Sequence, residues 1–299
     1  MKVLMTGSSG LIGTALRSFL GRGDHQVRRL LRTSSASHDA TSWNPADGTF
    51  AAGVFDGIDA VVHLAGESIA GGRWTAARKT RILESRVTLT RELCEGLARL
   101  DTPPKVLVAA SAIGFYGDRG NEVLDESAAA GDGYLPEVCQ TWEGAVAPAR
   151  ERGIRVVHLR IGVVLALLGG ALSQMLLPFK LGVGGVLGTG DQYMSWIALD
   201  DLLGIVLQAL TDESVSGPVN AVAPQAVTNR EFTKTLGAVL RRPTLFPVPA
   251  FALRLALGEM ADALLLASTR VEPAVLGRAG FEFAYPNLEG ALRHVLGRG

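Results

Sequence analysis

The chain has 299 residues, of which 47 % are hydrophobic and 19 % charged, so it is neither disordered nor of low complexity. Lys plus Arg equals Asp plus Glu at 29 each, which removes any general electrostatic attraction to nucleic acid or to an anionic membrane. It has two cysteines, Cys94 and Cys139, and no CxxC pair, so we expect neither a disulfide framework nor a bound metal.

The N-terminus does not resemble a signal peptide, because its apolar run is short and glycines follow at once. Residues 161–179 carry no charge, a length that approaches a membrane span. Glycines and a proline interrupt this stretch, which favours a buried strand, a glycine turn and a short helix. We therefore expect a cytoplasmic protein that does not cross a membrane.

In the first half, short hydrophobic runs alternate with longer helical patterns. The sequence predicts strands at residues 2–6, 26–31, 60–64, 105–110 and 155–160, and helices at 11–22, 75–100 and 135–152. The strands are almost continuously hydrophobic, as burial on both faces of a parallel sheet requires. The pattern predicts an α/β fold with a doubly wound parallel sheet.

The second half is glycine-rich and then helix-rich. It has glycine loops at 169–170 and 182–190, predicted helices at 199–211, 229–240 and 251–269, an apolar run at 218–222 and a Pro-rich break at 243–249. We expect a first domain over residues 1–165 and a smaller helix-rich lobe over 166–299. Some later segments of this lobe are expected to return to the first domain.

A glycine motif, Thr6-Gly7-Ser8-Ser9-Gly10-Leu11-Ile12-Gly13, joins the first predicted strand to the first predicted helix. In such a turn Gly7 permits the sharp bend, Gly10 allows close approach of a pyrophosphate, and Gly13 allows the helix to contact the strand. The helix N-terminus directs free N–H groups at the phosphates. The motif indicates a dinucleotide site, with a purely structural turn as the alternative.

The second predicted strand indicates which dinucleotide is bound. An NAD site usually has an acid about 20 residues after the glycines, at the end of this strand. Here the strand ends Arg28-Arg29-Leu30-Leu31-Arg32 without a carboxylate. An arginine can hold a 2′-phosphate bidentately, so NADP(H) is favoured over NAD(H); solvated surface arginines are the alternative.

Further motifs follow in a fixed order along the chain. They are His63-Leu64-Ala65-Gly66-Glu67 and the segments 73–75, 111–117, 160–165, 195–197, 200–201 and 257–261. With them the chain resembles the extended short-chain dehydrogenases/reductases, and more narrowly their "epimerase family" branch with its own C-terminal domain of unknown function. The resemblance covers essentially the whole length. It implies a Rossmann-type domain that binds NADP(H), a C-terminal substrate lobe, and the branch's own domain at about residues 245–299.

The resemblance also implies which residues contact the cofactor. Those expected at its phosphates are Gly7, Ser9, Gly10, Leu11, Ile12 and Gly13. It places Arg32 at the 2′-phosphate, and Leu64, Ala65 and Gly66 along the adenosine ribose and pyrophosphate, with Glu67 following into the cleft. Beyond the last predicted strand of the first half, Ile161, Gly162, Val163 and Val164 are expected near the nicotinamide.

The catalytic pattern of the wider superfamily is absent. Its active members carry a Tyr-x-x-x-Lys pair, in which the ammonium lowers the phenol's pKa so that the phenol can exchange a proton with substrate. In one register Leu135 and Cys139 stand at those two positions, and a shift by one residue places Tyr134 and Val138 there, so neither register gives the pair. Ala112 stands where a Ser or Thr is usual, one residue after Ser111.

Substitute groups are therefore candidates for the proton transfer. They are Tyr134 and Tyr116 as donors, Glu67 and Glu137 as carboxyls, Cys139 as a thiol, and Ser111. For each of these, an ordinary structural role is the alternative.

Two functions follow from these observations. One is an NADP(H)-dependent carbonyl reductase or nucleotide-sugar epimerase with an atypical proton donor. The other is a non-catalytic NADP(H)-binding sensor or partner-binding protein. The expected partner is a small-molecule substrate of unknown identity, and the sequence does not determine the oligomeric state.

Overall fold

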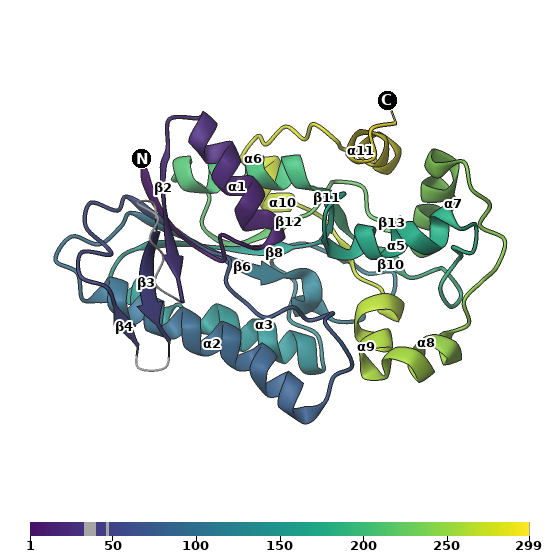
Figure 1. The fold of residues 1–299 in the computed structure, drawn as a ribbon, viewed down its shortest axis with the longest axis horizontal. Helices are drawn as coiled ribbons and strands as arrows, with labels where there is room; N and C mark the ends of the chain where they lie inside the picture. Colours follow the sequence, from purple (N-terminus) through teal and green to yellow (C-terminus); the bar gives the residue numbers. More distant parts are fainter. Residues whose placement is uncertain (33–39, 46–47, 299) are drawn as a thin grey trace.

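The central sheet is built from hydrophobic segments that are close to those predicted. Its strands are β1 (Lys2–Thr6), β2 (Gln26–Leu31), β3 (Ala40–Asn44), β4 (Thr49–Phe50), β5 (Ala60–His63), β6 (Val106–Ala112), β8 (Arg155–Ile161) and β12 (Gly217–Ala221). The computed structural model describes residues 1–32, 40–45 and 48–298, and within them the eight strands lie in the order β12-β8-β6-β5-β1-β2-β3-β4 (Figure 1). Each neighbouring pair is parallel except β3–β4.

Helices cover both faces of the sheet. On one face lie α1 (Leu11–Arg22) and α6 (Leu199–Thr211); on the other lie α2 (Ala76–Ala98), α3 (Tyr134–Gly144) and α4 (Ala147–Glu151) (Figure 1). Successive side chains of a strand point to opposite faces. Accordingly Val3 and Met5 join the hydrophobic cluster under α1, whereas Leu4 joins the cluster under α2. The predicted α/β fold with a doubly wound, mostly parallel sheet is confirmed.

The rest of the chain is richer in helices. Its helical segments are η1 (Ile113–Tyr116), α5 (Gly170–Lys180), α7 (Asn229–Leu240), α8 (Ala250–Leu257), α9 (Glu259–Ala261), η2 (Asp262–Leu266), α10 (Ala274–Arg278) and α11 (Leu288–Val295). Its short strands are β7 (Val123–Leu124), β9 (Val163–Leu165), β10 (Tyr193–Met194), β11 (Trp196–Ala198), β13 (Val227–Thr228) and β14 (Arg270–Val271). Although β12 comes late in the chain, it pairs with β8 at the edge of the central sheet.

Two predicted helices are broken where the backbone cannot continue. The helix predicted over 135–152 splits into α3 and α4, because Pro148 in the first turn of α4 has no N–H for a preceding helical turn. The helix predicted over 251–269 stops at Gly258, whose φ of 64° and ψ of −144° lie in a region that glycine adopts readily and that does not continue a helix. A short helix and a π turn follow, and residues 267–269 are not helical.

Residues 161–179 divide among three elements. They contribute the last residue of β8, all of β9 and most of α5. In the part of the chain that the structure describes, no helix is long and apolar enough to cross a membrane.

Candidate functional site

The turn between β1 and α1 is shaped by its glycines. Gly7 has a φ of 65°, and a Cβ at this position would lie 2.5 Å from the Leu64 carbonyl carbon. A Cβ at Gly13 would lie 2.2 Å from the Gly7 oxygen, so helix and turn touch backbone to backbone. Gly10 caps α1 without a side-chain hydrogen bond, and Ser9 and Gly10 are exposed. The first amides of α1, from Leu11 onward, therefore face an open cradle suited to an anion.

A buried hydrogen-bond network fixes the loop after β5 against this turn. The Thr6 hydroxyl oxygen accepts the backbone N–H groups of Leu64 and Ala65 at 3.2 and 3.3 Å, so its proton goes to His63 Nδ1 at 2.7 Å. His63 Nε2 then donates to the Thr90 hydroxyl at 2.9 Å, which assigns the neutral imidazole tautomer. Burial lowers the pKa of His63 to about 4, in keeping with this neutral form. The loop is thus held beside the glycine turn.

Glu67 lies at the end of that loop and is directed toward α2. Its backbone N–H donates to the Ser85 hydroxyl at 3.0 Å. Its carboxylate lies 3.8 Å from Arg78 and 3.5 Å from Arg81, both on α2. The preceding residue, Gly66, is exposed at the carboxyl edge of the sheet. Ligands of open α/β sheets bind at this edge.

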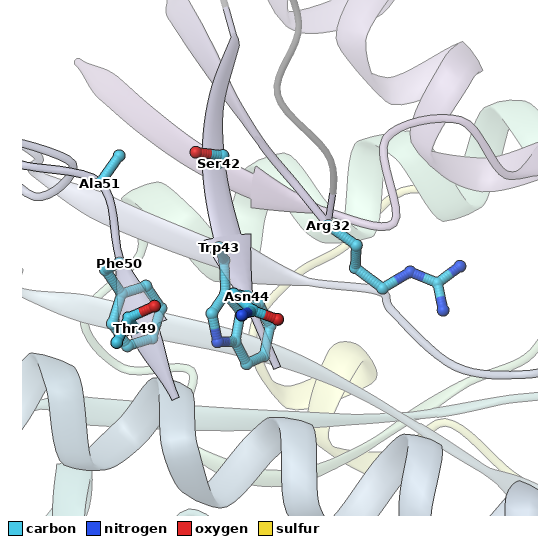
Figure 2. Close-up of a pocket in the computed structure, with 7 residues that line it drawn as sticks. All are labelled: Arg32, Ser42, Trp43, Asn44, Thr49, Phe50 and Ala51. Carbon is cyan, nitrogen blue, oxygen red and sulfur yellow. The ribbon is translucent and has the colours of Figure 1, made fainter. Parts of the chain in front are cut away.

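Arg32 follows β2 at the same edge and is exposed. With Ser42, Asn44 and neighbouring residues of β3 and β4 it lines a pocket of about 310 Å³. Figure 2 shows its guanidinium extended away from the Trp43 and Phe50 rings, which stack at 5.3 Å. By contrast, Arg28 donates to the carbonyls of residues 53 and 54, both at 3.1 Å. The side chain of Arg28 is therefore held by backbone carbonyls, whereas Arg32, which follows the strand, is exposed to solvent.

Beyond β6, Ser111 is part of a polar network rather than a free hydroxyl. It donates to Glu143 Oε1 at 2.7 Å, and Glu143 also accepts Arg160 Nε and Nη2, both at 2.9 Å. The remaining Arg160 nitrogen, Nη1, donates to the Tyr116 hydroxyl at 2.9 Å, and that hydroxyl donates to Asn220 Oδ1 at 2.8 Å. Burial raises the pKa of Tyr116 above its usual range. The network joins β6, β8, β12 and α3 at the carboxyl edge.

On α3, the side chains of Leu135 and Cys139 point into the protein. Leu135 and Cys139 are buried, and both side chains approach Gly114. The Cys139 thiol donates weakly to the Ala112 carbonyl at 3.8 Å. Burial raises the pKa of Cys139 to about 12, so the group is a neutral thiol at physiological pH.

Tyr134 lies one residue earlier and is half-buried. Its hydroxyl donates to the Lys79 carbonyl at 2.9 Å, and its ring contacts Trp74 edge-on with centroids 5.1 Å apart. The Lys79 ammonium lies 4.8 Å above the ring and forms an ion pair with Glu259 of α9. Burial raises the pKa of Tyr134, and the nearby charge of Arg86 opposes that rise. Tyr134 therefore lies where the sheet domain meets the C-terminal helices.

The segment after β8 forms another part of this edge. Gly162 N–H donates to the Ala221 carbonyl at 3.1 Å, and a Cβ on Gly162 would lie 2.8 Å from the Ser195 carbonyl oxygen. Val163 N–H donates to the same Ser195 carbonyl at 2.9 Å, which starts the parallel pairing of β9 with β11. Ile161 and Val163 are half-buried, and Ile161 pairs with Ala112 at the end of β6.

The predicted site residues thus lie along one edge of the sheet, but they differ in how far they are exposed and in whether a hydrogen bond already engages them. The glycine turn, the 64–66 loop, Arg32 and the 161–163 segment all follow the carboxyl ends of parallel strands. Tyr134 lies at the same edge, whereas Cys139 is enclosed and Ser111 is bonded to Glu143. Within the described residues, no group of three or more His, Cys, Asp or Glu side chains can hold a metal ion.

Sequence reasoning missed Arg86, which lies among these residues. Its guanidinium carbon is 5.1 Å from the Trp142 ring centroid, and a Cβ on Gly66 would lie 3.4 Å from it. The signal was its position in α2: Ile82, Thr90, Leu93 and Leu97 form the buried stripe of this helix, and Arg86 interrupts it at helical spacing.

Comparisons with known proteins agree with this architecture. Residues 3–222 match the model of the "NAD dependent epimerase/dehydratase family", and residues 248–295 match a "domain of unknown function". An epimerase family protein of Mycobacterium bovis is 43 % identical over 296 residues, which cover 99 % of this chain and 98 % of that protein.

Two solved structures have a similar fold over nearly the whole of this chain. Human epimerase family protein SDR39U1, solved with NADPH, superimposes with a TM-score of 0.91 at 34 % identity and 99 % coverage of both chains. A structure described as the nucleoside-diphosphate sugar epimerase from Corynebacterium glutamicum has a TM-score of 0.82 at 39 % identity, and the match covers 99 % of this chain and 58 % of that one.

Proposed function

The chain belongs to the NAD dependent epimerase/dehydratase family, as its motifs predicted, and from this premise we propose that it is an NADPH-dependent carbonyl reductase with an atypical proton donor. The observation that carries the proposal is the backbone cradle at the glycine turn. Both Gly7 and Gly13 are positions where a Cβ would collide with backbone, and the first amides of α1 remain open beside them. This cradle suits a pyrophosphate.

NADPH is proposed over NADH because of Arg32. This exposed guanidinium follows β2, where NAD-binding folds carry an acid that holds the ribose 2′-OH. A guanidinium instead offers charge-assisted hydrogen bonds to a phosphate. The bound NADPH in the structure of the human relative is consistent with this choice.

When bound, NADPH supplies a hydride, so the protein must supply a proton to the carbonyl oxygen. Tyr134 is the proposed donor, because its half-buried phenol keeps a raised pKa and stays protonated at neutral pH. The same raised pKa makes it a poor base for the reverse oxidation. Cys139 and Ser111 are less suited, since both side chains are buried whereas Tyr134 is half-buried.

A non-catalytic NADPH-binding protein is the second candidate. The observation that favours it is the burial of Leu135 and Cys139, which one of the two possible registers of α3 aligns with the superfamily's Tyr and Lys. A screen of carbonyl compounds and nucleotide sugars, followed by NADPH absorbance, separates the two functions. Turnover that falls strongly in Tyr134→Phe supports the reductase, whereas tight NADPH binding without turnover supports the sensor.

Calorimetric titration with NADPH and NADH tests the cofactor assignment. We expect NADPH to bind at least about tenfold more tightly, and Arg32→Ala to remove most of that difference, because a charge-assisted pair contributes about 1.5–3 kcal/mol. Arg22→Ala, an exposed arginine at the end of α1, is the matched control and should leave both affinities unchanged. Equal affinities in the unaltered protein contradict the assignment.

A further inference from the structure

Three segments at the end of the molecule opposite β3 and β4 expose large apolar side chains (Figure 1). They are the end of α5, the connection between α7 and α8, and α8 itself. The exposed fractions of six of these side chains lie between 64 % and 77 %; they form what we call the apolar face and are Leu177, Leu181, Leu245, Phe246, Phe251 and Leu255. Single exposed apolar residues are ordinary in soluble proteins, whereas a group of them marks an interaction surface.

The three segments lie side by side. Arg242 Nε donates to the Lys180 carbonyl at 3.0 Å, and Val248 N–H donates to the Val186 carbonyl at 2.8 Å. The helix α8 begins two residues after Val248. The chain that follows α5 therefore runs against the chain that leads into α8, and the exposed side chains of both belong to one surface.

The helices α5 and α8 expose the same arrangement of side chains. Each carries an apolar residue, a basic residue three positions later and a second apolar residue one position after that. Residues three and four apart share a helix face, so a base lies beside two apolar side chains on each helix. All eight residues of α8 are at least partly exposed, so none is fully enclosed by the protein. The two triplets are Leu177-Lys180-Leu181 and Phe251-Arg254-Leu255.

The charges beside the apolar face are of one sign. Residues 166–190 and 240–258 contain all of its members, and they hold bases but no acid. Arg254 pairs with Asp262 of η2, whereas within the described part of the chain no ion pair engages the other bases. Since the whole chain is neutral, this excess is local. The bases are Lys180, Arg241, Arg242 and Arg254.

A second copy of this chain fits the apolar face poorly. In a two-fold dimer the same surface of both copies meets, so bases would approach bases with no acid in either segment to pair with them. An anionic bilayer complements both properties of the surface. Its interfacial region accepts Leu and Phe side chains, and its headgroups attract Lys and Arg.

We propose that the apolar face is a docking surface for an anionic membrane, with its Leu and Phe side chains in the interfacial region and the neighbouring bases at the lipid headgroups. Docking differs from spanning, because α5 has 11 residues and α8 has eight, whereas a span needs roughly 20. The balanced charge of the chain excludes a general attraction to membranes, and the proposed attraction is confined to this face. The inference does not depend on the proposed function, since it uses neither the cofactor residues nor Tyr134.

Cosedimentation of the full chain with lipid vesicles tests the surface. Vesicles of equal parts phosphatidylglycerol and phosphatidylcholine are the anionic probe, and vesicles of phosphatidylcholine alone are the neutral one. We expect binding to the anionic vesicles, at least about tenfold weaker binding to the neutral ones, and loss of binding at about 1 M salt, where charges are screened within about 3 Å.

Two variants separate the apolar and the basic contributions. Phe251→Ser combined with Leu255→Ser should weaken binding to the anionic vesicles by about tenfold or more, because it removes two side chains that would leave water. Lys180→Gln should weaken it by about fivefold, the contribution of one base near an anionic surface.

Matched controls come from exposed positions outside the apolar face. Arg22→Gln changes a base in the last turn of α1, as Lys180→Gln does in the last turn of α5. Val123→Ser changes an exposed apolar side chain on β7. Both controls should bind the vesicles like the unaltered protein. Thermal melts confirm that each variant is folded, and Lys180→Gln keeps the test informative if the double variant is not.

Three results would overturn the proposal. One is the absence of binding to anionic vesicles, or unchanged binding in folded double and Lys180→Gln variants. Another is equal binding to neutral and anionic vesicles. The third comes from light scattering without lipid: a dimer that Phe251→Ser with Leu255→Ser converts to a monomer assigns the apolar face to a second copy of the chain.

Discussion

Replacing Glu143 with alanine tests how much the buried ion pair at the carboxyl edge contributes to folding. The substitution removes three hydrogen bonds, two from Arg160 and one from Ser111. It leaves the Arg160 side chain, which is 5 % exposed, without its carboxylate. Breaking a buried pair in this way costs about 3–5 kcal/mol, because the remaining charge is desolvated and uncompensated. For a chain of this size we expect a fall in Tm on the order of 10 °C.

Glu122→Ala provides the matched control. Glu122 forms the same two-bond contact with Arg119, at 2.8 and 2.7 Å, but its side chain is 50 % exposed. An exposed pair is worth about 0–1 kcal/mol, so this variant should unfold close to the unaltered protein. Urea unfolding followed by circular dichroism measures both variants. If Glu143→Ala and Glu122→Ala shift the midpoint equally, burial does not determine the value of the pair, and the reasoning is refuted.

The same buried groups give two further predictions. Burial lowers the folded pKa of His63 and His158 from 6.5 to about 4, so the unfolded chain binds more protons between these values. Stability should be fully present above pH 6.5 and fall by about 3 kcal/mol per histidine as the pH drops toward 4. Unfolding curves across this range check it, and a His63→Asn variant with an unaltered slope would contradict the assignment. Burial also raises the pKa of Cys94 and Cys139 to about 12, so neither thiol should react with a disulfide reagent at pH 8 until the protein unfolds. Rapid labelling of the folded protein is the opposing result.

The sequence was sufficient for the sheet and for the cofactor edge, because both depend on local patterns. A buried parallel strand must be hydrophobic on both faces, and β1, β5, β6 and β8 show this directly. A strand-to-helix turn that touches a neighbouring loop needs glycine, as at Gly7. Local breaks were harder to predict. The pattern of residues 251–269 is helical, and its interruption depends on the positive φ of a single residue, Gly258.

The polar partners at the site could not be predicted, because they come from distant segments. Glu143 and Arg160 are 17 residues apart on different elements, and the His63 imidazole bonds to Thr6 and Thr90 on two others. Arg86 was visible in the sequence as a charge in an apolar helical stripe. Its meaning depends on the position of α3 beside α2, which no spacing within α2 specifies.

A lysine at position 139 would be buried beside the Arg86 guanidinium, and Cys139→Lys tests what that costs. The new ammonium would replace a thiol that is 4 % exposed and would lie near the Arg86 guanidinium, whose charge already acts on the thiol. Desolvation and like charge both depress the pKa of a buried lysine, by up to about 3–5 units, which costs about 4 kcal/mol or more at pH 7. Cys139→Met, similar in length but uncharged, measures the cost of size alone. We expect Cys139→Lys to be the less stable of the two at pH 7 and to approach Cys139→Met as the pH rises past about 10.4, because the lysine of the unfolded chain then also loses its proton. Equal stability of the two variants at pH 7 would mean that a buried ammonium at this position costs nothing, and the reasoning from burial and like charge would be refuted.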